Sequence, residues 1–197
     1  MTSASADIEA TDRRLAWLYM VGGAIGLLAA AVLLIEKVAL LKDPTYVPSC
    51  SINPILSCGS IMQTSQAEAF GFPNPLIGVA AFPVVVTTGV ALLAGASFPR
   101  WYWRGLLAGT IAGLAFVHWL IFQSLYRIGA LCPYCMVVWA MTITLLVVVA
   151  SIALRPLAGN PVLRVLHQWR WSIAALWFAA VILAILARFW EYWSTLL

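Results

Sequence analysis

The chain has 197 residues, of which 63% are apolar and only 9% are charged. Soluble domains carry about 25% charged residues, so this composition excludes an ordinary soluble globule and argues against a disordered chain. The net charge of +4 is too small to indicate a nucleic-acid-binding protein, and we expect no nucleic-acid partner. The composition instead predicts a polytopic membrane protein surrounded by a lipid bilayer.

Five segments lack Asp, Glu, Lys and Arg and are long enough, or nearly so, to cross a bilayer. They are residues 15–35, 75–96, 105–125, 136–154 and 171–187. At ~1.5 Å rise per residue, about 20 helical residues cover the roughly 30 Å hydrocarbon core. Lipid offers the backbone no hydrogen-bond partners, so these segments should be helices. The predicted fold class is therefore all-α.

The segments also predict how the chain is organised. We expect a cytoplasmic tail at 1–14 and a unit of four spans at 15–154, with an extracytoplasmic loop at 36–74. A cytoplasmic loop at 155–170 then leads to a fifth transmembrane helix with its tail at 171–197. Each of these boundaries rests on where the charged residues and the Asn-Pro or Arg-Pro breaks interrupt the apolar runs.

The orientation follows from the rule that loops richer in Lys and Arg stay in the cytoplasm. We therefore expect a multi-pass protein of the cell inner (plasma) membrane, with its N-terminus in the cytoplasm. The N-terminus and the second and fourth loops hold Arg13, Arg14, Arg100, Arg104, Arg155, Arg164 and Arg170, whereas the alternate segments hold only Lys37, Lys42, Arg127 and Arg188.

All four cysteines fall on the side predicted to lie outside the cytoplasm, where disulfides persist. Cys50 and Cys58 lie in the long first loop, and Cys132-Pro-Tyr-Cys135 precedes the fourth span. A helix N-terminus lowers the pKa of the first thiol of such a motif. The i,i+3 spacing puts both sulfurs on one helical face, with Cys135 deeper in the bilayer. The pattern favours a relay in which thiol–disulfide exchange passes two electrons between the pairs.

Other interpretations of the cysteines stay open at this point. They could form two structural disulfides or be buried free thiols. A four-cysteine zinc site is a further alternative, although Cys50 and Cys58 are spaced too widely for the usual knuckle, and we expect no metal. A c-type haem attachment is excluded because Met136, and not His, follows Cys135.

Several residues outside the cysteine motifs have structural interpretations. We expect His118, in the third span, to serve packing or a hydrogen bond between helices. We expect Glu36 and Lys37 to pair or to extend toward the membrane surface. We expect Glu68 to be a solvated charge, with docking of a partner or anchoring of the loop cap as the alternatives. Two small-xxx-small ridges predict close helix packing, and they consist of Gly22 and Gly26 and of Gly105, Gly109 and Gly113.

In the order of its motifs, the sequence resembles the vitamin K epoxide reductase family in its bacterial form. The resemblance covers roughly residues 15–154. It rests on Cys50 and Cys58 in the first loop, on Gly71-Phe72-Pro73-Asn74 at the start of the second span, and on the Cys132-Pro-Tyr-Cys135 motif. The resemblance implies a four-helix bundle around a quinone, menaquinone or ubiquinone, capped by the first loop. The fifth transmembrane helix is additional to that bundle.

The resemblance also implies a role for each cysteine. Cys135 would face the quinone and form the transient adduct or charge-transfer pair. Cys132 would resolve it and exchange with Cys58. Cys50 would exchange with a thioredoxin-like dithiol protein, which we expect to be a separate partner because the chain ends at Leu197.

The same resemblance implies a quinone pocket. Asn74 matches the position that hydrogen-bonds a quinone carbonyl, and Trp139 stands where vertebrate members carry a ring-binding Tyr. An indole donates one hydrogen bond and accepts none. Thr64, with Ser65 beside it, corresponds to the small hydroxyl residue of the family. Further aromatic residues that could wall the quinone are Phe82, Phe116 and Trp119.

Together these inferences predict a membrane thiol oxidoreductase that supports disulfide-bond formation. Electrons would pass from the dithiol partner through Cys50/Cys58 and Cys132/Cys135 to the quinone. The alternatives are a quinone epoxide reductase that uses the same cysteines, and a non-enzymatic membrane scaffold with structural disulfides.

Overall fold

The computed structural model describes residues 2–154 and 159–195. Within them the chain is helical, as predicted, and five helices are long and apolar enough to cross a membrane. The long helices are α1 (Thr2–Lys42), α3 (Pro75–Leu93), α4 (Arg100–Phe122), α5 (Pro133–Ala153) and α6 (Pro161–Arg188). The short ones are α2 (Cys58–Met62), η1 (Ser65–Glu68), the π-helix η2 (Gln123–Ile128) that continues α4, and α7 (Trp190–Ser194).

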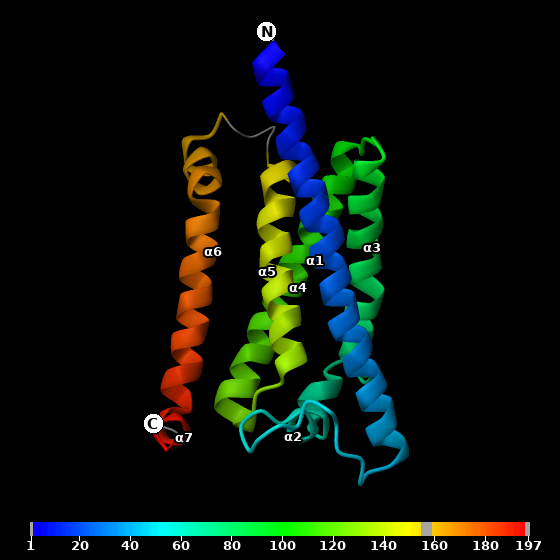
Figure 1. Ribbon diagram of the computed structural model, residues 1–197, viewed down its shortest axis with the longest axis vertical. Helices are drawn as coiled ribbons and strands as arrows, with labels where there is room; N and C mark the ends of the chain where they lie inside the picture. Colours follow the sequence, from blue (N-terminus) through cyan, green and yellow to red (C-terminus); the bar gives the residue numbers. More distant parts are fainter. Residues whose placement is uncertain (1, 155–158, 196–197) are drawn as a thin grey trace.

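The long helices run side by side along the molecule, and the chain ends lie at opposite ends of it (Figure 1). Helix α1 packs against both α3 and α5, α5 packs against α4, and α6 stands at the outside of the bundle against α5. The loop that contains α2 crosses the end of the bundle away from the N-terminus (Figure 1). The bundle therefore presents one closed end, and that end holds the cysteine loop.

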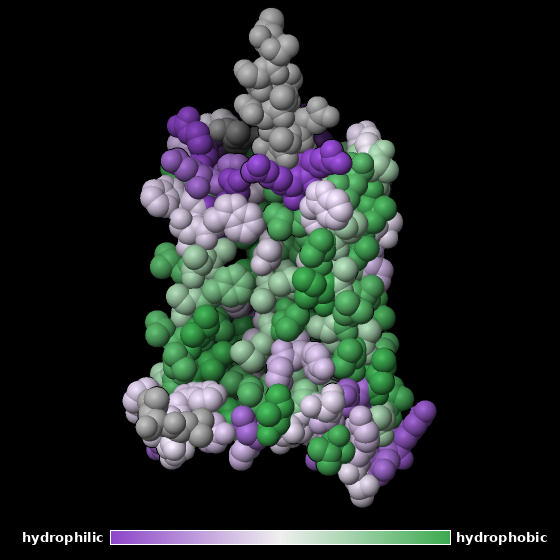
Figure 2. Space-filling view, in the orientation of Figure 1, coloured by the Kyte–Doolittle hydropathy of each residue, from purple (hydrophilic) through white to green (hydrophobic). Residues whose placement is uncertain are grey.

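The surface has the distribution expected for a membrane protein. Figure 2 shows a broad apolar band across the middle of the visible face of the molecule, with hydrophilic residues gathered at its two ends. These helices are a multi-pass membrane fold, because an apolar band of this kind is stable only in contact with lipid.

Close approach of α1 and α3 builds the most tightly packed part of the bundle. A Cβ on Gly89 would lie 2.6 Å from the backbone nitrogen of Met20 and 2.9 Å from the carbonyl oxygen of Ala16. A Cβ on Gly26 would overlap the ring of Phe82. The predicted packing role of the Gly22–Gly26 ridge is therefore confirmed at Gly26, where the absent side chain admits a ring from the neighbouring helix.

Two helices, α1 and α6, extend past the limits predicted from charge. Helix α1 already runs from Thr2 and ends only at Lys42, so helix occupies part of the predicted tail and of the loop at 36–74. Helix α6 begins at Pro161, inside the predicted loop at 155–170, because the Asn160 side chain caps it by accepting a hydrogen bond from Val162 N at 2.9 Å. Charged residues mark the edge of the bilayer, but they do not end a helix. Residues 155–158 of that loop lie outside the described residues.

Candidate functional site

A short backbone pairing joins the first loop to the segment before the Cys-x-x-Cys motif. Leu131 N donates to the carbonyl of Ile55 at 2.7 Å, and Ser57 N donates to the carbonyl of Leu131 at 2.9 Å, which forms a parallel bridge. The residue after Ser57 is Cys58, and the residue after Leu131 is Cys132. The bridge therefore brings together two cysteines that are far apart in the sequence.

The sulfurs of three cysteines form one buried group. Cys50 and Cys58 are joined by a disulfide, and Cys132 and Cys135 are free thiols. The Cys58 sulfur lies 3.1 Å from the Cys132 sulfur, and the exposed fractions of Cys50, Cys58 and Cys132 are only 3%, 0% and 1%. This is contact distance for thiol–disulfide exchange between the two pairs. Two of the three sulfurs that could reach a metal are bonded to each other and so offer no thiolate ligand in this state.

Cys132 is placed to act as a thiolate. It is the N-cap residue of α5, with Pro133 at the first helical position, and its sulfur accepts a hydrogen bond from Cys135 N at 3.4 Å. A hydrogen bond from the Cys135 thiol lowers the pKa of Cys132 below its ordinary value, and the backbone N–H groups of Cys135 and Tyr134 act in the same direction, against the effect of burial. A lowered pKa favours the attacking form of the sulfur that faces Cys58.

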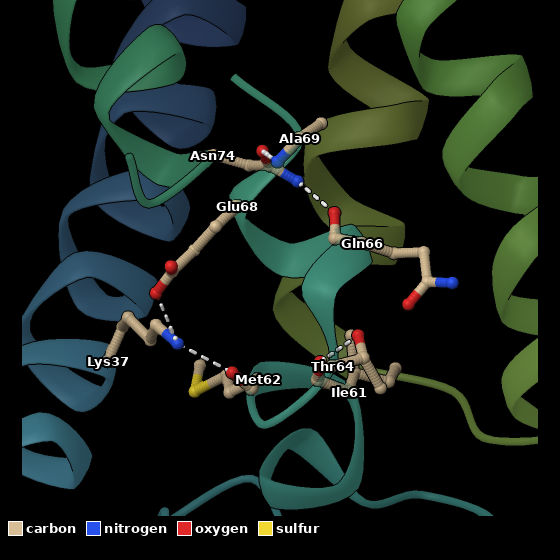
Figure 3. A network of polar contacts seen from close by, with 8 residues as sticks. All are labelled: Lys37, Ile61, Met62, Thr64, Gln66, Glu68, Ala69 and Asn74. Carbon is tan, nitrogen blue, oxygen red and sulfur yellow. Dashed lines mark hydrogen bonds and ion pairs between the residues drawn. The ribbon is translucent and has the colours of Figure 1, made fainter. Parts of the chain in front are cut away.

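The loop is fixed to the end of α1 by two consecutive charged residues. The Glu36 carboxylate accepts hydrogen bonds from the backbone and side chain of Ser49, the residue before Cys50. Lys37 donates to the carbonyl of Met62, the last residue of α2, at 2.6 Å and pairs with Glu68 at 2.9 Å (Figure 3). Glu68 therefore anchors the loop cap, the alternative to a purely solvated charge, while 37% of its side chain stays exposed. Its charge is needed because the Lys37 side chain is only 7% exposed.

Asn74 holds the other end of the loop, just before α3. Its side-chain oxygen accepts from Ala69 N at 3.0 Å, and its side-chain nitrogen donates to the carbonyl of Gln66 at 2.7 Å (Figure 3). The amide thus closes the loop on itself, and it also lines the cavity described next. An amide has two N–H groups and two lone pairs on its oxygen, so these contacts leave one donor and one lone pair for a ligand.

An apolar cavity of about 550 Å³ lies inside the four-helix bundle. Its wall includes Cys58, Cys132 and Cys135 at the capped end and reaches Trp101 and Tyr102 at the start of α4. The polar groups at the capped end come from Lys37, Gln66, Asn74, Gln123 and Ser124. The cavity therefore offers a long apolar volume that ends in polar side chains and thiols, the arrangement of a site for a lipid-soluble molecule with a polar head.

The glycines of α4 contribute to this cavity. Gly105 and Gly109 line it, and among the described residues a Cβ at either position would meet no atom within 4 Å. The prediction that this ridge packs helices is therefore wrong for Gly105 and Gly109. Glycines at this spacing indicate only that one face of the helix carries no side chains, and on α4 that face borders the cavity.

The predicted quinone-contacting residues fall into two groups. Asn74, Phe82, Phe116 and Trp139 line the cavity. The other three, Thr64, Ser65 and Trp119, lie outside its lining. The hydroxyl of Thr64 donates to the carbonyl of Ile61 and that of Ser65 to Gln66, whereas Trp119 stacks on Phe116. Their roles toward a ligand stay predictions.

The polar side chains at the capped end of the cavity include four that were not among the predicted site residues: Lys37, Gln66, Gln123 and Ser124. Of these, we expect Lys37 from the sequence to pair or to extend toward the membrane surface. A signal is present for Lys37, Gln123 and Ser124, because polar side chains at the ends of apolar spans tend to face a partner or a cavity. The sequence alone could not show which side of each helix faces the bundle interior.

Comparison with known proteins gives the family. A model described as the vitamin K epoxide reductase family matches residues 17–150, which include all four cysteines, the whole of α3 and α4, and most of α1 and α5. Members of that family are oxidoreductases and are generally linked to quinones or vitamin K. A comparison with curated proteins found no match. Because the family match spans more than half of the chain, this protein belongs to the vitamin K epoxide reductase family.

Proposed function

We propose that this protein oxidises the dithiol of a separate thioredoxin-like protein outside the cytoplasm and passes the two electrons to a membrane quinone, menaquinone or ubiquinone. Its product on the protein side is a disulfide in the partner, so the reaction supports disulfide-bond formation. The observation that carries the proposal is the 3.1 Å separation of the Cys58 and Cys132 sulfurs at the end of an apolar cavity.

The first half of the cycle reduces the disulfide of the loop. A thiolate of the partner attacks the Cys50 sulfur, and the Cys58 thiolate leaves. The second partner thiol then attacks the mixed disulfide, so the partner departs oxidised and Cys50 is released as a thiol. The loop pair has gained two electrons, and the partner has lost two.

The second half moves the electrons to the inner pair. Cys58 attacks Cys132 of a Cys132–Cys135 disulfide, and Cys135 leaves as the thiolate. Cys50 then attacks Cys58, which restores the Cys50–Cys58 disulfide and leaves Cys132 and Cys135 reduced. The pairing found here, with the loop disulfide closed and both inner thiols free, corresponds to this stage of the cycle.

The inner dithiol then delivers its electrons into the cavity. A quinone bound there would accept two electrons and two protons and become a quinol. Cys135 lines the cavity and Cys132 lies beside it, so closing the Cys132–Cys135 disulfide releases the required electrons and protons at the cavity wall. Asn74 retains a donor and an acceptor for the head group, and the apolar wall would hold an isoprenoid tail.

The proposal is tested with protein in nanodiscs, a reduced thioredoxin-like dithiol protein and added menaquinone or ubiquinone. We expect quinol to form in step with partner disulfide, and we expect Cys135→Ala to abolish both. Thr144→Ala is the control, because Thr144 also lies on α5 and its hydroxyl bonds within that helix. Continued oxidation of the partner by the Cys135→Ala protein with added quinone would contradict the proposed relay.

A second experiment separates the relay from a scaffold with structural disulfides. A thioredoxin-like protein that lacks its second thiol can attack Cys50 of the Cys50–Cys58 disulfide and release Cys58, but it cannot resolve the mixed disulfide, so the adduct on Cys50 should accumulate and mass spectrometry can identify it. In cells depleted of quinone, a relay accumulates reduced cysteines that can be alkylated. Cysteines that stay fully oxidised under that condition support the scaffold instead.

A further inference from the structure

The fifth long helix contacts the turn that leads into the Cys-x-x-Cys motif. Arg188, at the end of α6, donates from Nε to the carbonyl of Leu125 in η2 at 2.9 Å. Helix η2 ends at Ile128 and is capped by Gly129, whose φ of 71° is a left-handed conformation. The guanidinium lies beside Gly129, 4.0 Å from the position of a Cβ there. Arg188 therefore satisfies a carbonyl near the end of η2 and covers the turn that follows it.

A second polar contact fixes α6 against α4. The indole N–H of Trp177 donates to Nε2 of His118 at 2.7 Å, and Nδ1 of His118 lies 2.8 Å from the carbonyl of Leu114. An indole is only a donor, so Nε2 accepts and Nδ1 carries the hydrogen. The predicted interhelical hydrogen bond of His118 is thus present. This hydrogen bond fixes the position of α6 relative to α4 along the helix axes.

The turn that Arg188 covers positions Cys132. Ser124, the residue before Leu125, donates its hydroxyl to the carbonyl of Ala130, which closes the turn. The next residue, Leu131, makes the two hydrogen bonds to the cysteine loop. Behind this pairing, the end of α6 contributes Ile185 and Phe189 to the same buried cluster as Ile55 and Leu131.

We propose that α6 is a positioning element of the relay, and that Arg188 is its principal positioning residue. By holding the turn after η2, Arg188 keeps Leu131 paired with the loop and so keeps Cys58 within reach of Cys132. The family match ends at residue 150 and assigns nothing to α6. This inference rests on the proposed function in one respect, since only a relay needs the two sulfurs to stay in contact.

The test measures that contact directly, without quinone or partner. In a Cys50→Ala/Cys135→Ala background, only Cys58 and Cys132 remain, and they exchange with glutathione disulfide to give one internal disulfide and two glutathione thiols. The equilibrium constant of this reaction reports how well the fold holds the two sulfurs together. It is read by alkylation and mass spectrometry in nanodiscs at fixed glutathione ratios.

We expect Arg188→Met to lower this equilibrium constant about tenfold, the size of one charge-assisted hydrogen bond. Arg188→Lys should recover part of it, because lysine keeps a cationic donor. Arg164→Met is the matched control, since Arg164 is an exposed arginine near the opposite end of the same helix, and it should leave the constant unchanged.

An unchanged equilibrium constant in Arg188→Met protein overturns the proposal, as does an equal fall in the Arg164→Met control. If Arg188→Met protein does not fold, Trp177→Phe decides, because it removes the N–H that bonds to His118 and keeps a smaller aromatic ring at that position. A fall in the constant supports the positioning role, and no change contradicts it. A lowered constant in Arg188→Met protein, together with no quinone reduction by the unsubstituted protein, would count against the proposed function and leave the positioning role supported.

Discussion

Between α1 and α3 the glycines lie under the backbone and side chains of the neighbouring helix, whereas on α4 the glycines at the same helical spacing border open volume. Gly89 is covered by Met20 and Ala16, and Gly26 by Phe82, but Gly105 and Gly109 are uncovered within the described part of the chain. The first set lets two helices approach closely. The second set keeps a wall of the cavity free of side chains. The same residue type thus makes one side of the bundle rigid and the other side able to accept a ligand.

The largest effect is expected where backbone would be forced apart. Gly89→Leu should lower the free energy of unfolding by about 3 kcal/mol, because its Cβ alone would lie closer to Met20 N than atoms tolerate. Unfolding in mixed detergent, followed by circular dichroism, measures this. A Gly89→Leu protein as stable as the parent would contradict the tight packing of Gly89 against α1.

The same change on the other side should affect binding and leave folding intact. Gly109→Leu puts a side chain into the cavity, so we expect unfolding within about 0.5 kcal/mol of the parent and quinone affinity weakened about tenfold. Quenching of tryptophan fluorescence by added quinone measures the affinity. Ala108→Leu, next in sequence and outside the cavity lining, should bind like the parent. Equal binding by both variants would show that the glycine face is not part of a ligand site.

The capped end is held by charge, so its weak point should be the ion pair. Glu68→Gln leaves the Lys37 ammonium buried beside a neutral amide, and we expect a loss of about 1 kcal/mol, less than for a fully buried pair because Glu68 is 37% exposed. The Lys37→Met/Glu68→Gln double variant should recover part of that loss. Glu191→Gln, an exposed carboxylate, is the control. If the stability loss of the double variant equals the sum of the losses of Glu68→Gln and Lys37→Met measured singly, the two charges do not interact.

The smallest effect is a shift in a pH profile. The Cys135 thiol lowers the pKa of Cys132, so its removal in Cys135→Ala should raise that pKa. Because the thiolate exists above the pKa, the rate of Cys132 alkylation should rise at a more alkaline pH in the variant than in the parent. The rate of Cys132 alkylation by iodoacetamide is measured in quenched time courses across a pH series, for the variant and for the parent. Cys50 and Cys58 are kept as the disulfide throughout. Superimposable profiles would contradict a hydrogen bond from Cys135.

The comparison also shows what the sequence could predict. Apolar runs without charge correctly predicted the five membrane-length helices of the described residues, and the order of the cysteine motifs correctly indicated the family. Both are patterns along the sequence and need no knowledge of which residues meet in space. Gly105 and Gly109 were misassigned because a glycine ridge indicates only that backbone is accessible. What approaches it depends on where the neighbouring helices stand. For the same reason the sequence could not choose between a solvated Glu68 and one that anchors the loop cap, since its partner Lys37 is distant in the sequence.

Other features depended on local chemistry that the pattern of charges hides. Helix α6 begins at Pro161 because Asn160 caps it, whereas the basic residues that follow predict a loop at 155–170. The contact between Cys58 and Cys132 required the bridge between Ile55, Ser57 and Leu131, and hydrogen bonds of the backbone leave little trace in side-chain identity. The turn that Arg188 covers likewise depends on backbone carbonyl groups, those of Leu125 and Ala130, as hydrogen-bond acceptors.

The burial of the loop disulfide has a consequence for what can donate electrons to it. Cys50 is almost fully enclosed and its preceding residue is held by Glu36, so a small soluble thiol that collides with the closed loop finds little of the Cys50 sulfur exposed. A macromolecular donor that binds the loop can use the energy of that binding to lift the segment before Cys50. In the proposed relay, the closed loop would thereby favour a docked protein over free thiols as the electron donor.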